Sequence, residues 1–218
     1  MHKLTPSTLI DWEILFNNFI KANMTFDAAH DIDHVKRVVK NAKDICLKEN
    51  GNEQVVVPAA WLHDCYNVPK TSKLRSQGSK LSADKAIEYL REVNYPAEYL
   101  SAIHHAIHAH SFSAKIPTMT LEAEIVQDAD RIDALGALGL ARCIMYSAAQ
   151  NRPLYDSVDP FAENRELDEQ AFAIDHFYTK LLKLPDSIKT KNGKALANKR
   201  CTFLRLYLTT LKEEICPE

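Results

Sequence analysis

Glycine is scarce in this sequence, which has only 5 glycines among 218 residues. That share is about 2%, against a usual share of about 7%. Sheet proteins use glycine in hairpin turns and bulges, so the shortage argues against a strand-rich fold. The sequence also has no stretch of 18 apolar residues, as a membrane-spanning helix would need, and no long apolar run near its start, as a signal peptide would need.

The five cysteines form no C-x-x-C pair, and four of them lie within apolar helical patterns. This distribution indicates buried free thiols in a reducing compartment, so we expect a cytoplasmic protein. The formal net charge is only -2. No global basic field would therefore gather a nucleic-acid backbone, and we expect neither a duplex nor a membrane as partner.

Apolar residues recur at helical spacing along most of the chain, which predicts an all-α fold. Helices are expected to start near Thr5-Pro6, to include Val35 to Cys46, to be capped by Ser82, to open at Pro96, and to cover about 54–65, 121–149, 169–184 and 195–215. Gly136 and Gly139 would allow close packing or a kink in the long stretch 121–149. The polar stretches 67–80, 111–117 and 152–168 are expected to be loops.

Histidines and aspartates gather at four places that could carry chemistry, one of which is the run of histidines from His104 to His110. His34 lies at the polar edge of a helix, and His63-Asp64 ends an apolar one. Asp130 follows an apolar pair on a partly buried helix, where a lone carboxylate is costly unless it is paired or binds a metal. Each feature alone is usually structural: a core histidine, or acids favoured by a helix N-terminus. Their joint occurrence, each among apolar helices, favours a metal site built from separate elements.

These residues resemble the motifs of the HD superfamily of metal-dependent phosphohydrolases. His30-Asp31-Ile32-Asp33-His34 resembles the first motif, and the run Ile125 to Ala137 resembles the last one. The resemblance covers about residues 25–150, and helices at about 169–215 resemble the C-terminal part of single-domain bacterial members, so one domain over 1–218 is expected. It implies a helical bundle, the metal ligands His34, His63, Asp64 and Asp130, and Asp128 as a weaker ligand candidate.

Several further residues are predicted to assist. Asp64, His110 and Asp133 are the catalytic candidates, and the substrate phosphates would meet Arg37, Lys70, Arg75 and Arg131. Asp133 could equally be a supporting carboxylate. Arg131 could equally be an ion-pair partner, and His105 and His110 could hold a second metal. A mixed nitrogen and oxygen site favours Mn²⁺ or Mg²⁺, with Fe²⁺, Co²⁺ and Zn²⁺ left open.

The expected activity is metal-assisted hydrolysis of a phosphate ester or anhydride, with a nucleotide as the substrate. Cleavage of a nucleoside triphosphate to the monophosphate and pyrophosphate is favoured over phosphomonoester hydrolysis. A metal-scaffolded nucleotide sensor without turnover is the alternative. A zinc protease is disfavoured, because the pair His30 and His34 lacks the glutamate of an H-E-x-x-H motif.

Overall fold

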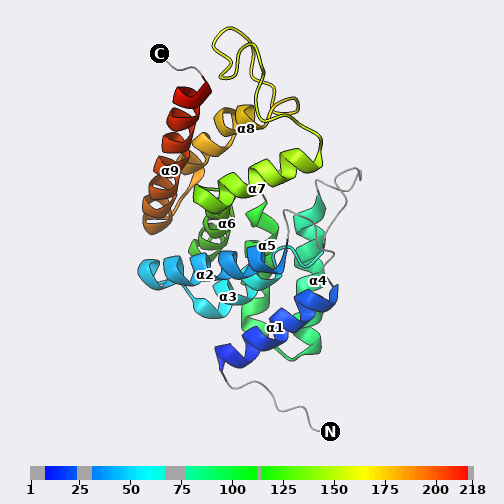
Figure 1. Ribbon diagram of the computed structural model, residues 1–218. Helices are drawn as coiled ribbons and strands as arrows, with labels where there is room; N and C mark the ends of the chain where they lie inside the picture. The colour runs from blue at the N-terminus through cyan, green and yellow to red at the C-terminus, as the bar shows by residue number, and fades with distance from the viewer. Residues whose placement is uncertain (1–7, 24–30, 67–76, 112–113, 216–218) are drawn as a thin grey trace. The chain divides into compact units, whose positions relative to one another are not determined.

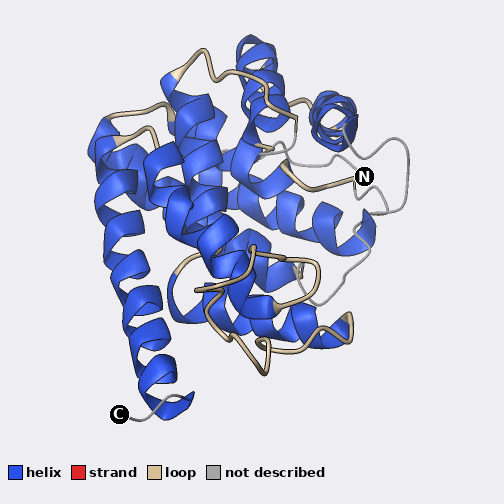
Figure 2. Cartoon of the chain, turned by 90° about the horizontal axis from the view of Figure 1, so that it is seen from above, coloured by secondary structure: helices blue, strands red, loops and turns tan. Residues whose placement is uncertain are grey.

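The computed structural model describes residues 8–23, 31–66, 77–111 and 114–215, and these contain helices and loops but no strand (Figures 1 and 2). The all-α prediction is therefore confirmed. The described residues form two compact units, divided within one helix: residues up to Asp130, and residues from Arg131 onward. Whether the whole chain is one functional domain stays a prediction.

The first unit holds the helices coloured blue to green in Figure 1. They are α1 (Leu9–Asn23), α2 (Ile32–Glu49), α3 (Glu53–Leu62), α4 (Gly78–Glu92), the short 3-10 helix η2 (Ala97–Tyr99), α5 (Leu100–His110) and most of α6 (Leu121–Asp133). Helix α3 packs against α1, α2 and α5, and α5 packs against α4. Because α3 is enclosed in this way, every residue from Val55 to Leu62 is buried.

Pro58 lies inside α3 and is accommodated by a distant tyrosine. Proline has no backbone N–H, so it cannot bond to the carbonyl four residues earlier, that of Gln54. The hydroxyl of Tyr95 donates to this carbonyl at 2.8 Å. Tyr95 also packs edge-on against Trp12 of α1, with ring centroids 4.9 Å apart. The proline therefore does not leave the Gln54 carbonyl unpaired.

The second unit holds α7 (Gly136–Ala149), α8 (Ala173–Thr179), the 3-10 helix η3 (Leu181–Ser187) and α9 (Lys191–Ile215). Helix α7 packs against α8 and α9, and η3 packs against both α8 and α9. Buried side chains on these elements, including Ile174, Phe177 and Leu204, form their core.

Several predicted boundaries were wrong. The pattern 121–149 is two helices, because the chain turns at Gly136, whose φ of +76° favours glycine. A Cβ at Gly139 would lie 2.1 Å from the Ala134 carbonyl oxygen, so this glycine permits a close approach. Helix α8 starts only at Ala173, because Asp168 Oδ1 accepts from the N–H groups of residues 170 and 171 and makes a turn there.

Two other helices begin earlier than predicted. Helix α9 starts at Lys191, and Thr190 Oγ1 accepts from Gly193 N at 3.1 Å as its cap. Helix α4 starts at Gly78, so Lys80 is helical and Ser82 is a buried interior residue instead of a cap. The expected start at Thr5-Pro6 lies outside the described residues.

None of the described helices is by itself long and apolar enough to cross a membrane. Helices α6 and α7 are long and apolar enough only when they are taken together, and the chain bends between them.

Candidate metal centre

His34 is presented by the first turn of α2. Asp31 caps this helix, and its side chain accepts from the His34 backbone N–H at 2.6 Å. Val35, Val38 and Val39 are buried, as the helical pattern predicted. Since the cap fixes the helix start and the valines fix its rotation, the His34 ring is held in the interior, where its side chain is only 3% exposed.

His63 and Asp64 lie where α3 ends. The His63 Nδ1 donates to the carbonyl of Ala60 at 2.8 Å, so the neutral ring presents the lone pair of Nε2. Just after the pair, Ser82 of α4 holds the backbone of Tyr66 twice: its hydroxyl donates to the carbonyl at 3.0 Å and accepts from the N–H at 3.3 Å. Ser82, which was predicted to be a helix cap, therefore anchors the turn that carries Asp64.

His110 ends α5, and Asp130 lies near the end of α6. The His110 Nδ1 donates to the Ile107 carbonyl at 2.6 Å, which leaves its Nε2 directed away from its own helix. Two buried amides attach α6 to its neighbours. Asn41 Nδ2 donates to the Ala129 carbonyl at 3.4 Å, and Gln127 Nε2 donates to the Ala109 carbonyl at 2.7 Å.

The side chains of these residues converge inside the first unit. His34 Nε2 lies 3.6 Å from Asp130 Oδ1, and His63 Nε2 lies 4.0 Å from the same oxygen. On the other side, Asp64 Oδ2 is 3.5 Å from His63 Nε2, and Asp64 Oδ1 is 3.5 Å from His110 Nε2. His63 is thus shared by two groups that could hold an ion: one with His34 and Asp130, the other with Asp64 and His110.

Burial differs between the histidines and the carboxylates. The side chains of His63 and His110 are 0% and 7% exposed, whereas Asp64 and Asp130 are 29% and 28% exposed. The imidazoles therefore form the floor of the site, and the carboxylates lie on its accessible side. A ligand that arrived from solvent would meet the carboxylates first.

The environment favours neutral His63 and ionised Asp64. Burial lowers the pKa of His63, although nearby Asp64 opposes that effect. Burial opposes ionisation of Asp64, but its interactions with His63 and His110 hold the pKa of this carboxyl well below its usual value. The pKa of His110 is raised, because its interaction with Asp64 outweighs its burial. Neutral imidazole and ionised carboxylate are the forms that bind metal.

The donor set fits a divalent ion. With bonds of roughly 2.1 Å, two ligand atoms on one ion lie about 3.0 to 4.2 Å apart, depending on the angle between them. The separations of 3.5 to 4.0 Å fall in this range. His63 Nε2 is also fully buried, and no group in the described part of the chain forms a hydrogen bond with it. A bound cation would satisfy that nitrogen.

Three of the other predicted site residues have different surroundings. Asp133 is fully buried and forms an ion pair with Arg142. Arg131 Nη1 donates to the carbonyl of Ser187 in η3 at 2.8 Å. Asp128, the weaker ligand candidate, is fully buried and belongs to neither of the two groups found in the described residues.

The remaining predicted cations are less defined. Arg37 lies half-buried on α2, one turn after His34. Lys70 and Arg75, which were predicted to bind phosphate, lie outside the described residues.

The other histidines of α5 have structural partners. His104 Nε2 lies 2.9 Å from Asp84 Oδ1, and His105 Nε2 accepts from the backbone N–H of Met119 at 2.9 Å. Among the described residues, His105 is in neither metal-capable group, whereas His110 is in one of them.

Sequence reasoning missed the two buried amides, Asn41 and Gln127. Each occupies a position on the buried face of an otherwise amphipathic helix. A polar residue on such a face is the signal that could have identified them, since buried polar groups need partners.

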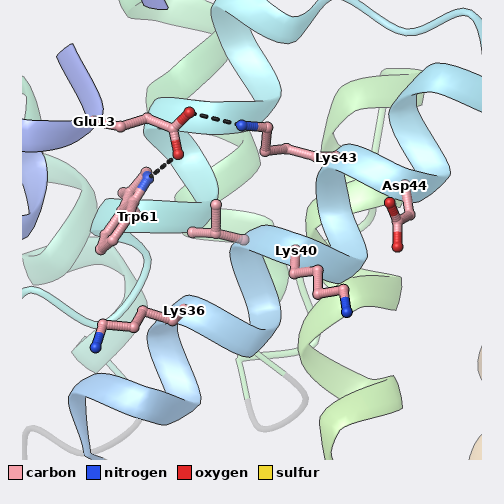
Figure 3. A pocket seen from close by; sticks show the side chains of 7 residues that line it. Glu13, Lys36, Lys40, Lys43, Asp44 and Trp61 are labelled. Atoms are coloured by element: carbon pink, nitrogen blue, oxygen red, sulfur yellow. Dashed lines mark hydrogen bonds and ion pairs between the residues drawn. The ribbon is translucent and has the colours of Figure 1, made fainter. Parts of the chain in front are cut away.

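A hollow of about 320 Å³ lies apart from these groups, beside α2 (Figure 3). Val39 and Asp44 of α2 contribute to its wall, and Lys36, Lys40 and Lys43 line it along one side. Its opposite wall is Glu13 of α1 and Trp61 of α3. Glu13 accepts from Lys43 Nζ at 2.7 Å and from the Trp61 indole N–H at 3.0 Å, so this contact ties α1, α2 and α3 together.

Comparison with known proteins agrees with this geometry. Residues 31–135 match the family model of the HD domain. YpgQ of Bacillus subtilis (strain 168) is 33% identical over 193 residues, which are 86% of this chain and 85% of YpgQ. A crystal structure of YpgQ in complex with ADP matches with a TM-score of 0.73 and 29% identity, over 94% of this chain and 98% of YpgQ.

A crystal structure of an HD-superfamily hydrolase from Bacillus thuringiensis is similarly close. It matches with a TM-score of 0.75 and 30% identity, over 97% of this chain and 100% of that one. The family model, the relatives and the His/Asp groups found in the described residues agree, and the chain therefore belongs to the HD superfamily of phosphohydrolases.

Proposed function

We propose that the protein is a metal-dependent phosphohydrolase that cleaves a nucleotide at the site formed by His34, His63, Asp64 and Asp130. The observation that carries the proposal is the approach of two carboxylates, those of Asp64 and Asp130, to the fully buried Nε2 of His63, with the His34 imidazole 3.6 Å from Asp130. Such a set without thiolates suits Mn²⁺ or Mg²⁺ in an enzyme that handles phosphates.

A divalent ion held there would supply Lewis-acid polarisation of a phosphoryl group and of the attacking water. The chain's own residues do the rest. Hydrogen bonds to the carbonyls of Ala60 and Ile107 orient the rings of His63 and His110. Asp64 and Asp130 contribute negative charge that balances the cation. In this proposal His110, whose Nε2 lies 3.5 Å from Asp64 Oδ1, would exchange a proton with the reacting groups.

The substrate proposed is a nucleoside triphosphate, cleaved to the monophosphate and pyrophosphate, with a phosphomonoester as the second choice. The ADP complex of YpgQ supports a nucleotide as the ligand class. Arg37, Lys70 and Arg75 stay predicted phosphate contacts. The bond from Arg131 to the carbonyl of Ser187 favours a structural role for that guanidinium.

The first experiment measures metal binding by metal-free protein. Wild type is expected to bind about one Mn²⁺ per chain, and His63→Ala and Asp130→Ala should each lose it, because each variant removes a ligand atom. His104→Ala is the matched control. It also removes a histidine of the first unit, but one whose partner is Asp84 and which is in neither metal-capable group of the described residues. Full occupancy in His63→Ala or Asp130→Ala would exclude that residue as a ligand.

The second experiment identifies the reaction. Protein with Mn²⁺ or Mg²⁺ is incubated with ribo- and deoxynucleoside mono-, di- and triphosphates, and products are identified by phosphorus NMR. Release of pyrophosphate and the monophosphate from a triphosphate supports the proposed cleavage between the α- and β-phosphates. Release of orthophosphate and the diphosphate indicates cleavage of the terminal phosphate instead. Nucleotide binding without turnover would contradict an enzymatic function and support the alternative, a metal-scaffolded nucleotide sensor.

A further inference from the structure

Two buried amide side chains contact the backbone next to residues of the metal centre. Gln127 of α6 is 3% exposed, and its Nε2 donates at 2.7 Å to the carbonyl of Ala109, the residue before His110. Asn41 of α2 is 5% exposed, and its Nδ2 donates at 3.4 Å to the carbonyl of Ala129, the residue before Asp130.

The helical register places each amide on the face that carries a site residue. Asn41 follows His34 by seven residues, or nearly two full turns, so both side chains point to the same side of α2. Gln127 precedes Asp130 by three residues and is its neighbour on the surface of α6. The two bonds therefore connect α2 to α6 and α6 to α5, and these helices carry His34, Asp130 and His110.

We propose that Gln127, assisted by Asn41, is a positioning residue that sets the separation of His110 and Asp130 in the metal centre. This inference rests on the proposed function, since it concerns the same site. Both amides act through the backbone beside a site residue, and neither is a member of the metal-capable groups in the described residues.

Stability alone does not account for a glutamine at this position. A carbonyl can only accept, so the Gln127 amide must direct its nitrogen toward Ala109. Its Oε1 is then fully buried, and no group in the described parts of the chain forms a hydrogen bond with it. An unsatisfied buried oxygen costs at least as much as one hydrogen bond returns. An apolar side chain of the same length would avoid this cost but would leave the buried Ala109 carbonyl without its donor, so the two effects offset each other. The structure therefore assigns the amide to placement of α5 and not to net stability.

The test is the variant Gln127→Met, which keeps an unbranched side chain of similar length and removes the amide. Two quantities are measured on metal-free protein: the affinity for Mn²⁺, by titration with detection of free Mn²⁺ by electron paramagnetic resonance, and the unfolding temperature. We expect the affinity to fall about 10-fold, as when residues that orient metal ligands are replaced, because the bond holds α6, which carries the proposed ligand Asp130, against α5. The unfolding temperature should change little, because the variant removes the buried oxygen of Gln127 but also leaves the Ala109 carbonyl without its donor.

Tyr95→Phe is the matched control. It also removes a side-chain bond to a backbone carbonyl in the first unit, from the Tyr95 hydroxyl to Gln54 at 2.8 Å, together with a bond of 3.1 Å to the side-chain oxygen of Gln54. We expect the opposite pattern from it, a lower unfolding temperature with unchanged Mn²⁺ affinity. A purely structural glutamine would instead make Gln127→Met behave like this control.

Wild-type Mn²⁺ affinity in Gln127→Met would overturn the inference and leave the proposed function standing. Absence of Mn²⁺ binding by the wild type would overturn both. If Gln127→Met does not fold, Asn41→Leu decides by the same two measurements. We expect it to weaken Mn²⁺ binding by a smaller factor, because its bond is longer, and unchanged affinity would refute the inference.

Discussion

Asp133 and Arg142 form an ion pair, and replacing the arginine should destabilise the fold more than replacing the aspartate. The Asp133 side chain is 0% exposed and that of Arg142 is 21% exposed, with Nη1 and Oδ2 2.5 Å apart. Arg142→Met leaves a fully buried carboxylate without its cation, which costs about 3–5 kcal/mol. Asp133→Asn leaves a guanidinium that water can reach, so its cost should be nearer to about 1–3 kcal/mol.

The assay is thermal unfolding followed by far-ultraviolet circular dichroism, which reports helices of both units. At about 2–4 °C per kcal/mol for a chain of this size, Arg142→Met should lower the midpoint by roughly 6–20 °C, and Asp133→Asn by less. The double variant should recover part of the loss, since no lone buried charge remains. Trp12 and Trp61 both lie in the first unit, so their fluorescence shows whether that unit unfolds separately.

The same variants decide whether Asp133 is catalytic, as the sequence suggested. If the ion pair is its main role, Asp133→Asn should keep kcat within a few-fold of wild type per folded molecule. A folded Asp133→Asn protein with kcat lowered by about 100-fold or more would refute this reasoning and return Asp133 to the reaction. Equal destabilisation by the two single variants would refute the argument from burial.

Three further outcomes follow from single contacts. His110→Ala should lower kcat by about 100-fold while the Mn²⁺ stoichiometry stays intact. Steady-state kinetics and elemental analysis measure the two quantities, and loss of the metal would indicate that His110 is a ligand instead. Glu13→Leu should lower the free energy of unfolding by about 1–3 kcal/mol, because the Trp61 indole N–H loses its acceptor. An unchanged midpoint of chemical denaturation, followed by tryptophan fluorescence, would contradict this. Burial raises the pKa of the Cys65 thiol from 9.0 to about 12, so its contribution to stability is complete below pH 9 and is lost as the pH rises toward 12. Cys65→Ala should therefore flatten the decline of the free energy of unfolding above pH 9, and a decline as steep as in wild type would disprove this.

Helical periodicity predicted the elements well where one apolar face decides the packing. In α2, Val35, Val38 and Ala42 were expected on the buried face and are buried. Prediction was poorer where a local polar contact ends or begins a helix. Asp168 makes a turn inside a region predicted to be helical, and Ser82, a residue typical of caps, instead holds the backbone of Tyr66. Side-chain partners of this kind depend on residues that are remote in sequence or on competing local bonds, which periodicity does not register.

The candidate ligands could be named from the sequence because they combine unusual chemistry with buried surroundings. His34, His63, Asp64 and Asp130 were each inferred beside apolar residues, and in the described residues they fall in two groups that share His63, one with His34 and Asp130 and the other with Asp64 and His110. The orientation of the rings was not predictable. It depends on carbonyls near helix ends, such as that of Ala60, which accept the ring N–H. Which carbonyls lack a donor within their own helix is known only once the helix boundaries are known.

Helix α6 shows why the roles of two similar residues on one helical turn cannot be distinguished from the sequence. Asp130 and Asp133 are three residues apart and follow similar apolar neighbours, so both were candidates for the chemistry. Asp130 is partly exposed and faces His34, whereas Asp133 is fully buried against Arg142. A carboxylate that must bind a cation from solvent has to stay accessible, while one that stabilises the fold is better sealed with a fixed guanidinium. The distinction therefore lies in the partner and in access to solvent, and for Asp133 the partner is nine residues further along the chain, on α7.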